Sequence, residues 1–131
     1  MGAEENAKTV RRGYEAFSAG DMATLTELFA DEPVWHVSGS AGLAGTKKGL
    51  DEVFSYFGAL VEKSGGTIKV TPHDVIGGDE HTIGLHHDYA ERDGKKLDHN
   101  VVLVFHLNAD GRIAEVWELH EDVANNDAFW S

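Results

Sequence analysis

The chain has 131 residues, with 23 acidic and 11 basic side chains, a formal net charge of −12 and no cysteine. This charge would repel nucleic acid and anionic membrane surfaces, so neither is expected as a partner, and the lack of cysteine excludes disulfides, thiolate zinc sites and cysteine nucleophiles. The first residues lack the apolar core of a signal peptide and no apolar run reaches membrane-spanning length, so we expect one domain over residues 1–131, located in the cytoplasm.

Helical periodicity dominates the first half of the chain. Apolar residues at spacings of three and four predict helices over residues 4–19 and 50–63. Gly20 ends the first of them, and Asp21 is predicted to cap a short helix that follows. A short strand is expected to begin at Pro33, and residues 38–49, which are rich in small side chains, are predicted to form a loop of the kind that often covers a pocket.

Strand patterns dominate the second half, over residues 67–76, 81–92, 95–107 and 112–122. The pair Asp93-Gly94 is a strong signal for a type I′ hairpin turn. Residues 123–130 are predicted to form a loop or a helical turn, with Phe129 and Trp130 packing on the body of the domain. Helices followed by antiparallel strands indicate an α+β fold.

Three stretches, "GD…LFADEPVWHV", the "KKG" before the helix at 50–63, and the closing "VWELHED", occur in an order and spacing that resemble a known family. Over about residues 5–130 the chain resembles the SnoaL-like branch of the nuclear transport factor 2-like (NTF2-like) superfamily. The resemblance implies a cone in which three N-terminal helices pack on a strongly curved, mixed, mostly antiparallel sheet around a deep pocket. Members include ketosteroid isomerases, limonene-epoxide hydrolases, polyketide cyclases, dehydratases and binding proteins, so the fold alone does not choose a reaction.

The hairpin over 81–107 has two faces, because side chains alternate along a strand. Counting outward from its two-residue turn places Asp88 opposite His99 and His86 opposite Val101 on one face, while the other face includes His87. Both faces are mixed, so alternation leaves open which one is concave. The resemblance turns the first face toward the pocket.

The resemblance also implies the composition of the pocket. Its polar residues, the candidates for catalysis, are Glu118, His86, Asp88, His99 and His120. The candidates for substrate binding are Trp35, Val37, Tyr14, Phe29, Phe54, Phe57, Val101, Leu103 and Val116. Imidazoles beside carboxylates in an apolar pocket suit proton transfer near neutral pH.

Departures from the named relatives narrow the reaction. Val37 and Leu103 stand where the isomerase has its catalytic base and its oxyanion-hole acid, so isomerase chemistry of that type is not expected. At the positions of the epoxide hydrolase triad the chain has Gly84, His86 and Glu118, and only the last keeps a carboxylate. Imidazoles at 86, 99 and 120 could form a zinc or iron site. No pair of ligands spaced i,i+2 or i,i+4 on one face supports such a site, and we expect neither a metal nor another cofactor.

The outer sheet face is predicted to carry an apolar patch of Ile83, Leu85, Val102, Val104, Trp117 and Leu119, which indicates a homodimer contact. The remaining histidines, His36, His73, His81, His87 and His106, are expected at the surface or in this contact. Two functions stay open. One is an acid/base isomerase, cyclase, dehydratase or hydrolase acting on an apolar, polyketide-like or terpenoid-like substrate, in which Glu118 and His86 exchange protons. The other is a non-catalytic protein that binds a small ligand in the same pocket.

Overall fold

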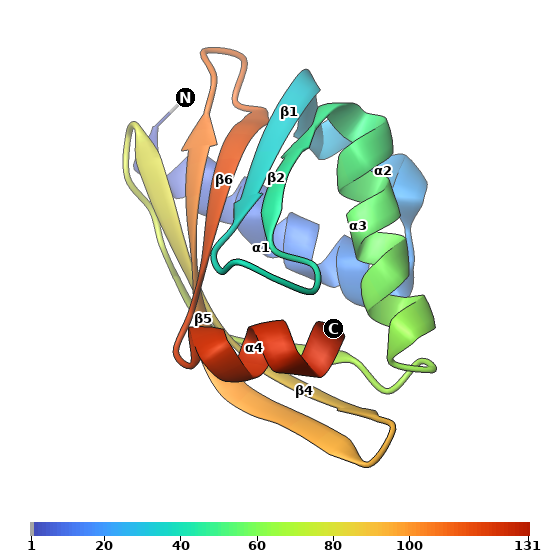
Figure 1. Cartoon of the computed structure of the whole chain (residues 1–131). Coiled ribbons are helices and arrows are strands. Elements are labelled where there is room, and N and C mark those ends of the chain that lie inside the picture. The colour runs from blue at the N-terminus through green and yellow to red at the C-terminus, as the bar shows by residue number, and fades with distance from the viewer. Residues whose placement is uncertain (1) are drawn as a thin grey trace.

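The computed structural model describes residues 2–131 and has one six-stranded sheet with four helices. In chain order the elements are α1 (Ala3–Ala19), α2 (Met22–Leu28), β1 (Phe29–Val37), β2 (Gly45–Lys48), α3 (Gly49–Lys63), β3 (Lys69–Ile76), β4 (His81–Arg92), β5 (Lys95–Leu107), β6 (Ile113–His120) and α4 (Val123–Trp130). Figure 1 shows the long strands β4 and β5 bending beneath α4. The expected α+β cone with a curved, mixed sheet is therefore confirmed.

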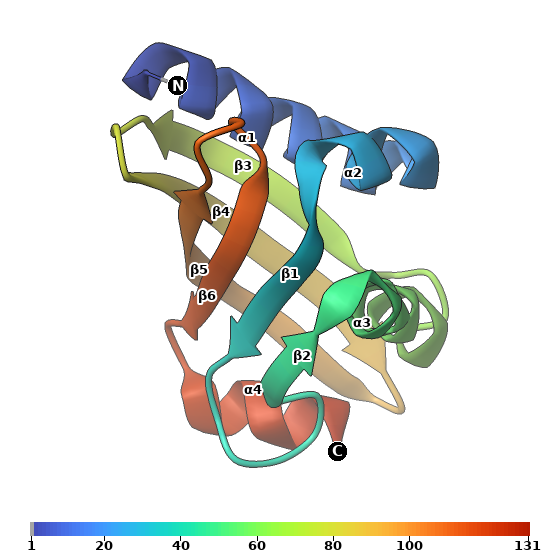
Figure 2. The ribbon, with the colours of Figure 1, turned by 90° about the horizontal axis from the view of Figure 1, so that it is seen from above.

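The strand order is β2-β1-β6-β5-β4-β3, and all neighbours are antiparallel except the pair β1 and β6. Seen from above, α1 crosses one end of the sheet and α4 lies at the other, while α3 stands at the side of β1 and β2 (Figure 2). The concave face is thus enclosed by helices from both termini. Within residues 2–131, no helix is both long and apolar enough to cross a membrane.

The hairpin of β4 and β5 has the register that its turn predicts. Arg92 lies opposite Lys95, and Asp88 lies opposite His99. The two turn residues have φ angles of 51° and 77°, the left-handed backbone that a type I′ turn requires. Because the register follows from the turn, the face occupied by every side chain of this hairpin follows as well.

Two segments differ from the prediction. The first strand begins at Phe29 and not at Pro33, because Phe29 is buried and pairs with Ile113 before a bulge carries the exposed acidic residues 31–32 outward. The predicted loop over 38–49 contains β2, which pairs antiparallel with β1 at the edge of the sheet. Neither feature has a strand-like alternation of apolar residues that sequence reading could detect.

The C-terminal tail, predicted as a loop or a helical turn, forms an eight-residue helix in addition to the three N-terminal helices. Asp122 caps α4 by accepting a hydrogen bond from the backbone N–H of Asn125 at 3.0 Å, as Asp21 caps α2 through Thr24 at 3.1 Å. Phe129 and Trp130 are 1% and 2% exposed, and they pack on the body as predicted. They form a second apolar cluster with Ala90 and Leu97, apart from the main core.

Candidate active site

The structure places the five predicted catalytic residues on the concave face. His86 and Asp88 lie on β4, His99 lies on β5, and Glu118 and His120 lie on β6 or at its end. All five are between 5% and 8% exposed. The neighbours that alternate with them along the strands are partly buried, such as His87, or exposed, such as Leu119. The predicted assignment of the two sheet faces is therefore confirmed, while the roles of these residues stay predictions.

A cavity of about 70 Å³ lies between α1, α3 and the sheet. Its wall includes five of the predicted substrate-binding residues, namely Tyr14, Phe29, Trp35, Phe57 and Leu103, and three of the polar candidates, His86, Asp88 and Glu118. Ligand pockets usually have volumes of about 300–1,000 Å³, so a drug-sized ligand would require the apolar wall to shift. The cavity as it stands fits only a very small molecule.

Four predicted substrate-binding residues do not line this cavity. They are Val37, Phe54, Val101 and Val116, and they pack in the main core. His99 and His120 are also absent from its wall and lie behind the carboxylates. Alternation along a strand predicts only that a side chain faces inward. It does not predict where the core is closed by packing and where a space remains.

Glu118 is enclosed by two hydrogen-bond donors and by an imidazole whose contact with it is close but is not a well-aligned hydrogen bond. The indole Nε1–H of Trp35 donates to its Oε1 at 2.8 Å, and the hydroxyl of Tyr56 lies 2.9 Å from both carboxylate oxygens. Nε2 of His120 lies 2.7 Å from Oε2. Burial raises the pKa of Glu118, but the contacts with His120, Trp35 and Tyr56 outweigh it and leave the pKa below its ordinary value. The site therefore holds an ionised carboxylate in an apolar wall.

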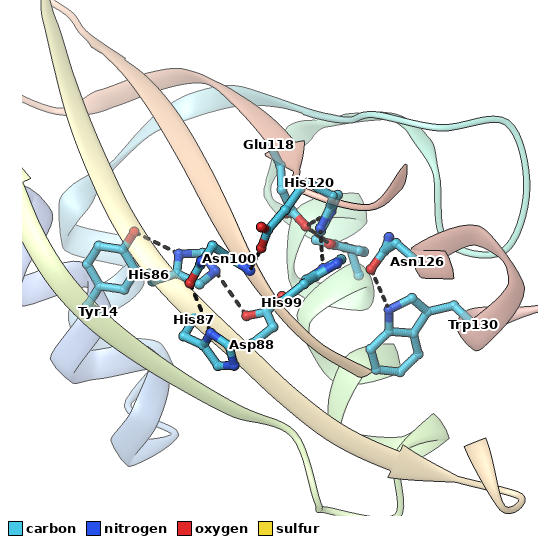
Figure 3. Close-up of polar contacts among 12 residues, drawn as sticks. Tyr14, His86, His87, Asp88, His99, Asn100, Glu118, His120, Asn126 and Trp130 are labelled. Carbon is cyan, nitrogen blue, oxygen red and sulfur yellow. Dashed lines mark hydrogen bonds and ion pairs between the residues drawn. The ribbon is translucent and has the colours of Figure 1, made fainter. Parts of the chain in front are cut away.

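His120 contacts Glu118 through one ring nitrogen and His99 through the other, on the side away from the cavity. Nδ1 of His120 lies 3.1 Å from Nε2 of His99 (Figure 3). Burial lowers the pKa of His120, but Glu118 more than restores it, so that the pKa is raised overall. Burial and the neighbouring His120 lower the pKa of His99. Together these shifts favour an imidazolium at His120 that donates to a neutral imidazole at His99.

A second polar chain joins α1 to β4. The hydroxyl of Tyr14 lies 2.9 Å from Nδ1 of His86, and Nε2 of His86 lies 3.0 Å from Oδ1 of Asp88. Burial and the charges of Asp88 and Glu118 raise the pKa of Tyr14, so the hydroxyl keeps its proton and can donate to Nδ1. Nε2 of His86 then carries the ring hydrogen, close to Oδ1 of Asp88 but not in line with it. Both ends of this chain line the cavity.

The contact between Tyr14 and His86 depends on a glycine. A Cβ atom at Gly84 would lie 2.4 Å from the Tyr14 hydroxyl oxygen. We expect Gly84→Ala to displace the buried Tyr14 ring and to lower the free energy of unfolding by about 1–3 kcal/mol, measured by urea denaturation. Gly58→Ala is the control, because Gly58 is an exposed position of α3 with no atom near its would-be Cβ. A loss no larger at Gly84 than at Gly58 would contradict this account.

Tyr56 is the polar residue of the cavity wall that sequence reasoning missed; nine other residues of the wall, from Val10 to Ile113, were also not predicted. It is 5% exposed and lies on α3, three residues after Val53 and four before Leu60. A tyrosine on the apolar face of a helix needs a partner for its hydroxyl, and that requirement was the available signal. Burial and the charge of Glu118 raise the pKa of Tyr56, so the hydroxyl stays protonated and donates to the carboxylate.

Removing that hydroxyl is expected to be costly. Tyr56→Phe should lower the free energy of unfolding by about 1.5–3 kcal/mol, the usual value of a hydrogen bond to a charged group. Chemical denaturation followed by circular dichroism measures the loss. Tyr89→Phe, on the partly exposed outer face of β4, is the matched control and should change stability little. Equal effects of the two substitutions would show that the contact with Glu118 adds nothing.

Comparisons with known proteins agree with this fold. The family model described as a SnoaL-like domain matches residues 10–116. The uncharacterized protein Rv0034 of Mycobacterium tuberculosis is 36% identical over 123 residues, which are 93% of this chain and 93% of that protein. Bal32a, from a soil-derived mobile gene cassette, has a solved structure with 43% identity, a TM-score of 0.94 and 98% coverage of each chain.

A solved structure described as a putative SnoaL-like polyketide cyclase from Jannaschia sp. CCS1 has a TM-score of 0.80 over 98% of this chain and 94% of its own. Its identity to this chain is 16%, so the likeness concerns the fold alone. The more similar relatives carry no assigned reaction in their names.

Proposed function

Since this chain belongs to the SnoaL-like domain family, as the family model over residues 10–116 shows, we propose that it is a small-molecule enzyme working by general acid/base catalysis. The observation that carries this proposal is the setting of Glu118. Its carboxylate forms part of the wall of an apolar cavity, and Trp35, Tyr56 and His120 hold it in one orientation. Such a carboxylate can accept a proton from a substrate carbon or from a water.

His86 supplies the second proton-transfer group. It lines the same cavity, and Tyr14 and Asp88 fix its ring from both sides. Glu118 would accept a proton from the substrate and His86 would return one at another atom. That exchange is what an isomerase, a cyclase or a dehydratase requires. His120 and His99 act as positioning residues, because they contact the carboxylate and lie behind the cavity wall.

The wall of the cavity favours an apolar substrate. It is made mainly of aromatic and aliphatic side chains from α1, α3 and the sheet. A ring-containing substrate of the polyketide or terpenoid kind matches this chemistry. The present volume of about 70 Å³ means that such a molecule would enter only when the aromatic wall moves apart.

A non-catalytic binding protein is the second candidate. It is favoured because both carboxylate oxygens of Glu118 already have partners within the protein. Trp35, Tyr56 and His120 together surround both carboxylate oxygens, and this lowers the carboxylate's tendency to take up a proton. In this case the carboxylate would orient a ligand by a hydrogen bond, and nothing would be converted.

One pair of variants separates the two candidates. Native mass spectrometry of the protein with a metabolite extract identifies a bound ligand, and its conversion is then followed with Glu118→Gln and Glu115→Gln. Both positions lie on β6, but Glu115 is on the outer face, beside His36. The enzyme proposal expects Glu118→Gln to bind the ligand without converting it, while Glu115→Gln converts it normally. Unchanged turnover in Glu118→Gln would contradict the role of Glu118, and a wild-type protein that binds but converts nothing would favour the binding protein.

We also propose that two copies of the chain associate through the outer sheet face. Leu119 is 49% exposed, and the ring of Trp117 beside it stacks on His36 with ring centroids 5.6 Å apart. Leu119→Glu is expected to shift wild-type dimers to monomers in size-exclusion chromatography with light scattering. Val61→Glu is the control, because Val61 is 50% exposed on α3, away from the sheet. A monomeric wild-type protein would refute the contact.

A further inference from the structure

We propose that Asp88, His99 and His120 form a binding site for one divalent transition-metal ion. The three residues come from β4, β5 and the end of β6, which are neighbours in the sheet. Each offers one ligand atom, and these atoms all lie within 4.8 Å of one another. The proposal stands apart from the proposed function, because it concerns what the cluster binds and not what the cavity converts.

The sheet register explains why the three groups meet. Asp88 and His99 are direct cross-strand partners, and His120 lies opposite Val101, two residues from His99 on the same face. Side chains at such positions converge on the concave side. Because the residues come from three strands, no short spacing in the sequence reveals them, and the expectation of no metal site depended on such a spacing.

The orientation of the two imidazoles supports coordination. Nε2 of His99 and Nδ1 of His120 point toward each other at 3.1 Å. Without an ion, one of these nitrogens must carry a hydrogen and donate it to the other. With an ion placed between them and the carboxylate, both lone pairs and one oxygen of Asp88 would become ligands.

The surrounding carboxylates complete the arrangement. Metal-bound histidines commonly donate their other ring N–H to a carboxylate, which fixes the ring. Here Nε2 of His120 lies 2.7 Å from Oε2 of Glu118. Oδ1 of Asp88 is buried and lies 3.0 Å from Nε2 of His86, but within residues 2–131 it accepts no well-aligned hydrogen bond. A buried charge of this kind favours a cation nearby.

The donor set selects the class of ion. Two imidazoles and one carboxylate suit Zn²⁺, Fe²⁺ or Co²⁺, whereas Mg²⁺ and Ca²⁺ prefer oxygen ligands alone. Three protein ligands leave a coordination position open. Asp88 also lines the cavity, so one ligand of the ion would border the ligand space. A bound ion would be coordinated by Nδ1 of His120 and Nε2 of His99. The hydrogen bond between these two nitrogens and the coordination of an ion therefore exclude each other.

Isothermal titration calorimetry of untagged, chelator-treated protein with Zn²⁺ and Co²⁺ tests the proposal by measuring the stoichiometry and affinity of binding. We expect one ion per chain, with no binding of Mg²⁺. Asp88→Asn and His99→Asn should each weaken binding more than tenfold, and Glu118→Gln should weaken it by about 10- to 100-fold as the partner of a ligand. The matched controls are Asp98→Asn and His87→Asn, an outer-face pair from the same two strands.

A second measurement uses only the wild-type protein, so it does not depend on whether the variants fold. In NMR spectra of the histidine side chains, addition of Zn²⁺ should shift the ring resonances of His99 and His120 and leave those of His87 unchanged. The absence of stoichiometric binding would overturn the proposal. So would an ion that is lost with His87→Asn, because it would then lie on the outer face. Either result leaves the conversion test with Glu118→Gln unaffected.

Discussion

Replacing Glu118 by alanine is expected to lower the free energy of unfolding by about 3–5 kcal/mol, the usual cost of removing one partner of a buried ion pair. The substitution leaves the indole N–H of Trp35 and the hydroxyl of Tyr56 without their acceptor. It also leaves the imidazole of His120 buried without its counter-charge. Each unpaired buried group costs free energy because water cannot replace the lost partner.

Chemical denaturation of Glu118→Ala beside two other variants isolates this effect. Glu118→Gln keeps an oxygen that can accept from Trp35, so it should lose less stability than the alanine variant. Glu115→Ala removes an outer-face carboxylate of the same strand, paired with the partly exposed His36, and should cost at most about 1 kcal/mol. If Glu118→Ala were no more destabilised than Glu115→Ala, Glu118 would not be held as its contacts indicate.

The parts of the fold that were predictable are those governed by local rules. A two-residue turn fixed the register of β4 and β5, and helical spacing identified α1 and α3 close to their observed limits. The edge strand β2 and the early start of β1 depend on pairing between distant segments. Their residues, such as Gly45 and the exposed acidic pair at 31–32, have low strand preference. Tertiary contacts, and not local sequence, place them in the sheet.

The candidate site divides in the same way. Once the resemblance had chosen the concave face, alternation placed His86, Asp88 and His99 on it correctly. The connections between these groups could not be predicted, because they depend on side-chain directions across elements. The hydroxyls of Tyr14 and Tyr56 reach the site from α1 and α3, and each ends within 2.9 Å of its partner. Helix packing determines that reach, and no spacing in the sequence encodes it.

The polar cluster is also an energetic burden that the rest of the fold must offset. Two carboxylates and three imidazoles lie among apolar side chains, and each buried polar group costs free energy unless it is paired. A well-packed apolar core of the same volume is often as stable or more stable. The pairing of these groups limits the cost without removing it. Proton exchange, ligand orientation or metal binding would each give this arrangement a use that stability alone does not.

Helix α4 closes the end of the sheet beside this cluster. In Figure 3, Asn126 and Trp130 lie on the side of His99 and His120 that is away from Tyr14. The helix is fixed to the hairpin of β4 and β5, because Arg92 donates to the carbonyl of Phe129 at 2.8 Å and Lys95 donates to that of Ala128 at 3.0 Å. The apolar side of the contact is the cluster of Phe129 and Trp130 with Ala90 and Leu97.

Phe129→Ala should therefore lower the free energy of unfolding by about 3–5 kcal/mol, the typical cost of emptying a fully buried phenylalanine site. Phe129 is 1% exposed, and its ring meets that of Trp130 edge to face with centroids 4.7 Å apart, so the substitution removes this contact together with the buried area. Val123→Ala, at a position of α4 that is 37% exposed, should change stability by less than about 0.5 kcal/mol. Urea denaturation measures both, and amide hydrogen exchange should show faster exchange at His99 and His120 in Phe129→Ala only. Equal stability of the two variants would mean that α4 rests on the sheet without closing it.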